Sequence, residues 1–171
     1  EGLHTYGGIA GRDMEAIAVG IMESMNDAHQ AARVGQVAYL GKKMQDYGIP
    51  IVKPIGGHGV FVDAKAFLPH LTQNEFPAQT LAGEVYIDSG VRTMERGIVS
   101  AGRKPNGENY KPKLELVRFT LPRRVYTQAH MDVVAESVAL VHERRKTIKG
   151  LKMIYEPKYL RFFQARFEQL K

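Results

Sequence analysis

Cysteine is absent from the 171 residues, and so is any long apolar run. The lack of cysteine excludes disulfides, thiol catalysis and cysteine-based metal sites, and it fits a reducing compartment. A membrane helix needs roughly 20 apolar residues, and a signal peptide needs a charged start before an apolar core. Neither pattern occurs in the sequence. We therefore expect a cytoplasmic protein with no membrane segment.

Concentrated positive charge is also lacking, although the net charge is +6 and the isoelectric point is near 9.5. A nucleic-acid-binding module gathers Lys and Arg on one face with aromatic residues between them, whereas here they are spread along the chain. The densest cluster, at 144–146, fits a helix C-terminus, where cations complement the helix dipole. Six His without Cys give no zinc signature. We expect no nucleic-acid partner and no transition metal.

What the chain does contain is typical of one ordered, soluble domain, with 44% hydrophobic and 25% charged residues. Apolar residues at helical spacing predict a long helix that is bent near residues 26–27 and ended by residues 47–50. The spacing is set by Met14, Ile17, Ala18, Ile21, Met25, Val34, Val37, Leu40, Gly41 and Met44.

The remaining pattern alternates short strands with helices. The predicted strands are residues 51–52, 59–63, 91–94, 114–121 and 151–155. One helix is predicted from Pro77 to Ser89 and Gly90, and another from an N-cap at Thr127 to Gly150. Residues 159–167 form an ambiguous apolar tail. This mixture predicts an α/β domain, layered in the α+β manner.

Five segments of the chain form recognisable motifs: EGLHTYGG at 1–8, VRTMERG at 91–97, LELVRFTLPRR at 114–124, PRRVYTQAHMD at 122–132 and YEPKYLRFF at 155–163. These segments resemble the tyrosine phenol-lyases, which belong with the tryptophanases to the β-eliminating lyases. The resemblance implies the C-terminal part of a pyridoxal-phosphate enzyme of the aspartate-aminotransferase-like fold type I. It also implies a homotetramer and a monovalent cation such as potassium.

The same resemblance divides the chain into the end of a large domain with a connecting helix, residues 1–48, and a C-terminal small domain, residues 49–171. The chain begins with Glu1 rather than Met, inside a matching segment, which suggests a fragment. The cofactor lysine, the phosphate loop and the acid that pairs with the pyridine nitrogen are implied to lie in an N-terminal half that is not in this sequence. We expect no cofactor-binding residue here.

Arg118 is the strongest candidate for a substrate-binding residue. The resemblance implies that it binds the α-carboxylate of an amino acid, and a planar guanidinium suits this role because it gives two parallel hydrogen bonds. Strand alternation places Arg118 opposite Val117 and Phe119, so it can face a cleft. From position alone, an exposed strand Arg or an ion pair with Glu115 is the alternative.

Arg96 is the candidate catalytic residue, and it separates two related families. The resemblance implies that Arg96 faces the phenol oxygen of tyrosine, whereas tryptophanases are aliphatic there. Cleavage expels phenol after the ring becomes a tautomer with a carbonyl oxygen, and a nearby cation stabilises negative charge on that oxygen. The alternative for Arg96 is a surface ion pair with Glu95.

Four further residues are candidates for the site. Phe162 is expected to border the substrate ring, where tryptophanases carry His, and Phe163 is expected to pack, although aromatic pairs in a tail are more often core filling. His58, in a Gly-Gly-His-Gly turn, is either a residue near the cleft or a turn His bonded to the backbone. Tyr6 is either an active-site neighbour or a buried Tyr.

The sequence therefore predicts a piece of an enzyme that converts L-tyrosine and water to phenol, pyruvate and ammonia, inactive without its missing half. A tryptophanase-type lyase is the first alternative. A catalytically silent binding domain is the second, because these residues supply neither a Schiff-base lysine nor an electron sink.

Overall fold

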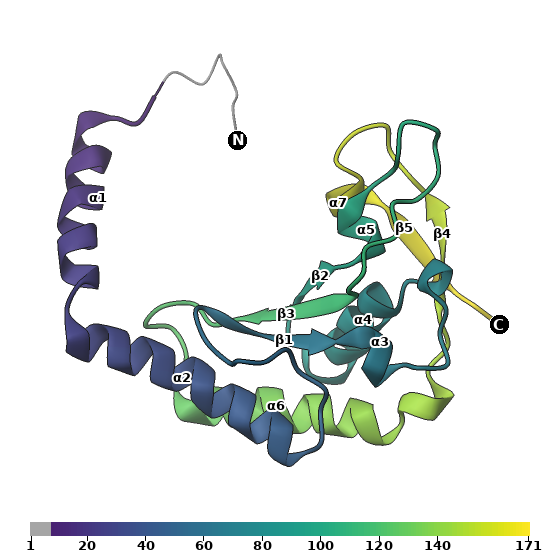
Figure 1. The fold of residues 1–171 in the computed structure, drawn as a ribbon, viewed down its shortest axis with the longest axis horizontal. Coiled ribbons are helices and arrows are strands. Elements are labelled where there is room, and N and C mark those ends of the chain that lie inside the picture. Colours follow the sequence, from purple (N-terminus) through teal and green to yellow (C-terminus); the bar gives the residue numbers. More distant parts are fainter. Residues whose placement is uncertain (1–7) are drawn as a thin grey trace.

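The computed structural model describes residues 8–171, so Tyr6 lies outside the described residues (Figure 1). Two helices come first, α1 (Gly11–Ser24) and α2 (Asp27–Asp46). The predicted bend is confirmed as a break, because Met25 caps the end of α1 and Asn26 caps the start of α2 by accepting a hydrogen bond from the His29 N–H at 3.1 Å. The two helices stand at a steep angle to each other.

The two helices differ in how they are packed. No residue of α1 is buried, whereas α2 buries Val37, Leu40, Gly41 and Met44. α2 also bonds to the later helix α6 (Gln128–Glu143), because Tyr39 Oη lies 2.6 Å and Lys43 Nζ lies 2.5 Å from Asp132 Oδ1. The predicted apolar stripe is therefore a packing face only in its second half.

Three antiparallel strands form the sheet, in the order β1 (Gly59–Asp63), β3 (Leu116–Thr120) and β2 (Met94–Arg96). The predicted strand at 51–52 is wrong, because Ile51 makes only an isolated bridge to Val62. The strand predicted at 91–94 lies later, at Met94–Arg96. The other three predicted strands are confirmed: those at 59–63 and 151–155 have the predicted bounds, and β3 falls inside 114–121.

Helices cover one face of this sheet. α4 (Pro77–Ser89) contacts β2 and β3, and it packs against α6. α4 has the predicted bounds, with proline at its start and Gly90 at φ 73° after its end. α6 begins after Thr127 as predicted, but the predicted end at Gly150 is wrong, because a 3₁₀ turn at Arg145–Thr147 intervenes.

Gly150 has a different reason to be small. A Cβ at that position would lie 2.6 Å from the Cβ of Glu75, so the backbone there passes too close to residue 75 for any side chain. It marks a close approach between segments, rather than a helix end.

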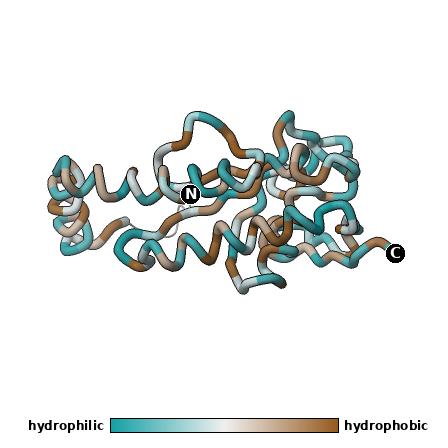
Figure 2. Tube along the Cα trace, turned by 90° about the horizontal axis from the view of Figure 1, so that it is seen from below, coloured by the Kyte–Doolittle hydropathy of each residue, from teal (hydrophilic) through white to brown (hydrophobic). Residues whose placement is uncertain are grey.

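The core is a single large cluster of the sheet, α2, α4 and α6, joined by the short helix α3 (Ala64–Phe67). Hydrophobic and hydrophilic stretches alternate along the helical turns seen in Figure 2, as expected for helices with one packed face. The mixed helix and strand composition predicted for the chain is confirmed. The boundary at residue 48 remains a prediction. Within residues 8–171 no helix is long and apolar enough to span a membrane.

A second, smaller cluster joins the C-terminal hairpin to the sheet region. The hairpin is β4 (Leu151–Tyr155) and β5 (Arg166–Gln169), and α7 (Arg161–Gln164) lies between its strands in sequence. This cluster is centred on Phe76 and on Ile98 and Val99 of α5 (Ile98–Ala101). The ambiguous tail is thus a helical turn followed by a strand.

Candidate functional site

The sheet has an open face, opposite the helices, and the predicted arginines share it. Register pairs Met94 with Arg118 and Arg96 with Leu116, while Phe61 of β1 pairs with Arg118 on its other side. Residues directly opposite in adjacent strands point to the same face. One surface, which we call the open face, is therefore formed by Phe61, Asp63, Met94, Arg96, Leu116 and Arg118.

Arg118 lies at the centre of the open face and is half-buried. Its Nη2 donates to Met94 Sδ at 2.9 Å, and its Nε has no hydrogen-bond partner among residues 8–171. The alternative ion pair with Glu115 is wrong, because the Glu115 carboxylate accepts from Gln73 Nε2 and from the Ile98 N–H, both at 3.0 Å. A guanidinium with only a thioether partner retains donors for a carboxylate.

Arg96 is an exposed diagonal neighbour of Arg118, a relation in which Cα atoms lie about 7–8 Å apart. The alternative pairing with Glu95 is wrong. Glu95 is 3% exposed on the core face, and its two oxygens accept from the Val99 N–H at 3.1 Å and the Ser100 N–H at 2.9 Å. Arg96 thus has no carboxylate partner within the described part of the chain.

Two buried carboxylates beneath Arg96 fix the local backbone, and sequence reasoning missed both roles. Glu95 and Glu115 bond to the first N–H groups of α5, on either side of Gly97. A Cβ on Gly97 would lie 2.0 Å from Glu115 Oε2, so only glycine fits. Burial raises the pKa of Glu95, and it raises the pKa of Glu115 to about 7.

The two C-terminal phenylalanines have opposite environments. Phe162 is half-buried and packs against the cluster of Phe76, Ile98 and Val99. Phe163 is 74% exposed, so the expectation that it packs is wrong, and its ring meets Phe162 edge-on at 5.1 Å. Phe163 is the freer of the two rings for contact with a ligand or another part of the protein.

His58 lies in an exposed turn beside the open face. Its ring meets Phe61 edge-on at 6.1 Å, and its backbone carbonyl accepts from the Leu121 N–H at 3.0 Å. Both interpretations of His58 therefore stay open. Its backbone is bonded within the turn, and its ring lies next to the open face that holds Arg118. Tyr6 is outside the described residues.

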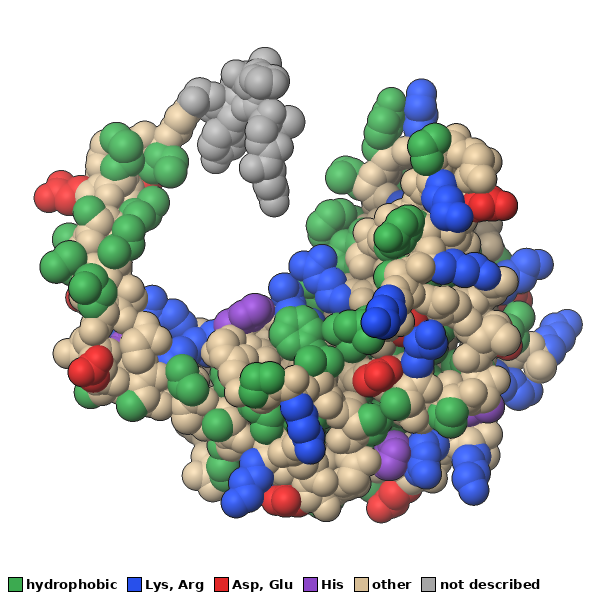
Figure 3. Space-filling model, in the orientation of Figure 1, with side chains coloured by type: hydrophobic (Ala, Val, Ile, Leu, Met, Phe, Trp, Pro, Cys, Tyr) green, Lys and Arg blue, Asp and Glu red, His purple; other side chains and the backbone are tan. Residues whose placement is uncertain are grey.

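A hollow lies between α1 and the body of the molecule in Figure 3. Lys and Arg side chains and a His are seen near its floor, whereas hydrophobic side chains cover its α1 side. The cations near the floor attract anionic groups. The hollow thus has a cationic floor and an apolar wall.

The described residues do not fit a covalently held carbonyl cofactor. An imine-forming lysine is commonly desolvated so that its pKa falls. Lys43 is the one half-buried lysine in residues 8–171, and hydrogen bonding to Asp132 raises its pKa instead. The same residues include no group of three side chains placed to hold a metal ion.

The sheet lies within the part of the chain that matches a known protein family. The β-eliminating lyase model matches residues 14–137, which include the whole sheet with both arginines of the open face. Phe162 and Phe163 lie beyond the matched range.

Individual relatives match over almost the whole chain. A tyrosine phenol-lyase of Nostoc punctiforme is 69% identical over 169 residues, covering 98% of this chain and 36% of that protein. The tyrosine phenol-lyase of Symbiobacterium sp. is 64% identical over 171 residues, covering 99% and 37%. That of Intrasporangium calvum is 62% identical over 170 residues, covering 99% and 36%. The chain thus spans a little over a third of the length of these relatives.

Proposed function

Because the chain belongs to the β-eliminating lyase family, we propose that it supplies the C-terminal, substrate-reading part of a tyrosine phenol-lyase. The complete protein would cleave L-tyrosine with water to phenol, pyruvate and ammonia. The observation that carries the proposal is the pair Arg96 and Arg118, which share the open face and have no carboxylate partner among the described residues.

Arg118 binds the α-carboxylate of the substrate in this proposal. A strand holds its backbone and Met94 orients one end of its guanidinium, so little side-chain freedom is lost on binding. The remaining donors form the bidentate contact. Because every amino-acid substrate has this carboxylate, Arg118 provides affinity rather than discrimination.

Arg96 provides discrimination, because it meets the opposite end of the substrate. Its position one diagonal away from Arg118 suits a ligand with an anionic group at each end, the carboxylate and the developing phenolate. A cation placed where charge develops stabilises the transition state more than the ground state. Phe162, and Phe163 beside it, would frame the ring between these ends.

Pyridoxal phosphate is the cofactor that the family implies. When bound, it supplies the electron sink for elimination. Residues outside this chain would hold it, since no described lysine fits that task. The same proposal includes a potassium-type monovalent cation, a homotetramer and a cytoplasmic location.

The chain alone should show no lyase activity, because no lysine among residues 8–171 is suited to hold the cofactor. The check is to add pyridoxal phosphate and tyrosine to the purified 171-residue chain and to follow phenol release and visible absorption. Steady phenol release by the chain alone would refute this prediction. A protein completed with the N-terminal half should release phenol.

Tryptophanase is the competing activity. A cationic side chain at Arg96 and phenylalanine at Phe162 favour a phenol over an indole as the leaving group. The completed protein should therefore release phenol from tyrosine much faster than indole from tryptophan. Efficient indole release would move the assignment to tryptophanase, and release of neither would leave a silent binding domain.

A further inference from the structure

Arg161, the first residue of α7, is a buried cation with little compensation. It is 9% exposed, and its Nε lies 3.5 Å from Glu156 Oε1. None of its three guanidinium nitrogens makes a hydrogen bond to residues 8–171. Burial lowers its pKa, although an arginine stays charged. Buried charges are normally paired and fully bonded, so this one calls for an explanation beyond core packing.

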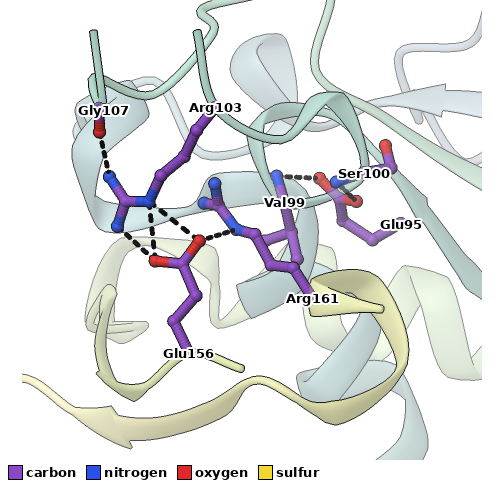
Figure 4. A network of polar contacts seen from close by, with 7 residues as sticks. All are labelled: Glu95, Val99, Ser100, Arg103, Gly107, Glu156 and Arg161. Atoms are coloured by element: carbon purple, nitrogen blue, oxygen red, sulfur yellow. Dashed lines mark hydrogen bonds and ion pairs between the residues drawn. The ribbon is translucent and has the colours of Figure 1, made fainter. Parts of the chain in front are cut away.

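The counter-charge of Arg161 is shared with a second arginine. Arg103 Nε donates to both Glu156 oxygens at 2.8 Å, and Arg103 Nη1 donates to the Gly107 carbonyl at 2.7 Å. Figure 4 shows Glu156 between Arg103 on the outer side and Arg161 on the inner side, with Glu95 further inward. Attraction from Glu156 and Glu95 acts on the Arg161 cation against repulsion from Arg103.

The short helix α5 contacts α7, which begins at Arg161. The two residues that we propose to contact the phenol ring, Arg96 and Phe162, are both linked to α5. Next to Arg161, Phe162 packs against Ile98 and Val99 of α5. The first N–H groups of α5 are bonded to Glu95 and Glu115. Arg96 directly follows Glu95, so Arg96 and Phe162 are both linked to the same short helix.

We propose that Arg161 is a positioning residue for substrate discrimination: its buried cation holds α7 against α5 and thereby sets the distance between Phe162 and Arg96. The inference rests on the proposed function, because it concerns the leaving-group end of that same site. Arg161 lies on α7, outside the three strands that carry Arg118 and the rest of the open face. Its loss should therefore affect the substrate ring and leave carboxylate binding intact.

The test uses Arg161→Met in the complete enzyme, because methionine fills similar space without charge. The kcat/KM for tyrosine should fall by about tenfold or more, since misplacing a positioning group by about 1 Å can cost about a hundredfold. Elimination from S-methylcysteine, which has no ring, should change by less than about threefold. Affinity for phenol, measured by calorimetry, should fall in parallel with tyrosine cleavage.

Arg103→Met is the matched control, because Arg103 pairs with the same carboxylate from the exposed side. It should leave the ratio of the two substrates within about twofold of the unmodified enzyme. Arg161→Lys keeps the positive charge but lacks the planar guanidinium. It should lower kcat/KM for tyrosine by a smaller factor than Arg161→Met and still affect tyrosine more than S-methylcysteine. The lysine variant also decides the matter if the methionine variant does not fold.

The outcomes separate this inference from the proposed function. Equal losses for tyrosine and S-methylcysteine, or an unchanged ratio in both Arg161 variants, would overturn the positioning role. An unmodified enzyme that eliminates S-methylcysteine but releases no phenol from tyrosine would instead overturn the proposed function.

Discussion

The two faces of the small sheet use the same three strands for opposite purposes. The core face buries Val60, Val62, Val117 and Phe119 against helices, and its one carboxylate, Glu95, is fully bonded. The open face has arginines whose only described partner is a thioether. A face that lies outside the core and keeps unpaired donors is suited to a ligand, since stability alone would favour pairing or removing such charges.

The largest effect should come from the core face. Phe119→Ala removes a side chain that is 4% exposed and should lower the free energy of unfolding of the chain by about 3–5 kcal/mol. Thr120→Ala, the next residue and exposed, should change it by less than about 0.5 kcal/mol. Urea denaturation of both variants provides the check. Similar losses would mean that the two faces are not distinct.

The buried Glu115 should make stability depend on pH. Its folded pKa is about 7 against an ordinary 4.5, so the folded state binds its proton more tightly than the unfolded state. This contribution to stability is present below about pH 4.5 and is lost as the pH rises through about 7. The loss is up to about 3 kcal/mol, at about 1.4 kcal/mol per pKa unit.

Glu115→Gln keeps an acceptor for the Ile98 N–H and removes the titration. Denaturation measured at pH 5 and pH 8 should therefore show a smaller fall in stability for the variant than for the unmodified chain. A parallel fall in both proteins would mean that Glu115 does not hold its proton in the folded state.

Substitutions on the open face should change substrate affinity and leave the stability of the fold nearly unchanged. Arg118→Ala in the complete enzyme should weaken binding of tyrosine and alanine alike by about 1.5–3 kcal/mol, the contribution of a charged hydrogen bond. Thermal unfolding should stay nearly unchanged. Arg166→Ala, an exposed position on β5 outside the three-stranded sheet, is the control and should leave both affinities unaltered. Unchanged affinity in the Arg118 variant would assign the carboxylate to another cation.

Local chemistry made part of the fold predictable. Pro77 and Gly90 bracket α4, and Thr127 precedes α6, because caps and fixed backbone angles act over a few residues. The prediction that α6 ends at Gly150 was wrong. A glycine is needed there because the backbone passes close to Glu75, a residue far away in the sequence. The apolar periodicity also predicted one long, bent helix where the structure has α1 and α2. Such spacing does not show whether an apolar face packs against other elements.

The site shows the same limit. Period-2 alternation placed Arg118 opposite Val117, and register then adds that Arg96 and Met94 share its face. Glu95 and Glu115 were considered only as alternative ion-pair partners of the arginines, because a glutamate is seldom fully buried. The two carboxylates can be buried because they accept hydrogen bonds from backbone N–H groups of α5. No local sequence pattern predicted this helix. Long-range pairing is the information that one sequence does not display.

The proposal that the open face binds tyrosine and selects it over other substrates depends most directly on Arg96. The decisive measurement compares tyrosine and S-methylcysteine elimination side by side in Arg96→Ala of the complete enzyme, with the exposed Arg92→Ala as control. We expect tyrosine cleavage to fall by a factor on the order of a hundred or more, the scale of losing one transition-state donor, and S-methylcysteine elimination to remain within about threefold. An equal loss for both substrates would make Arg96 a structural residue and would contradict the account.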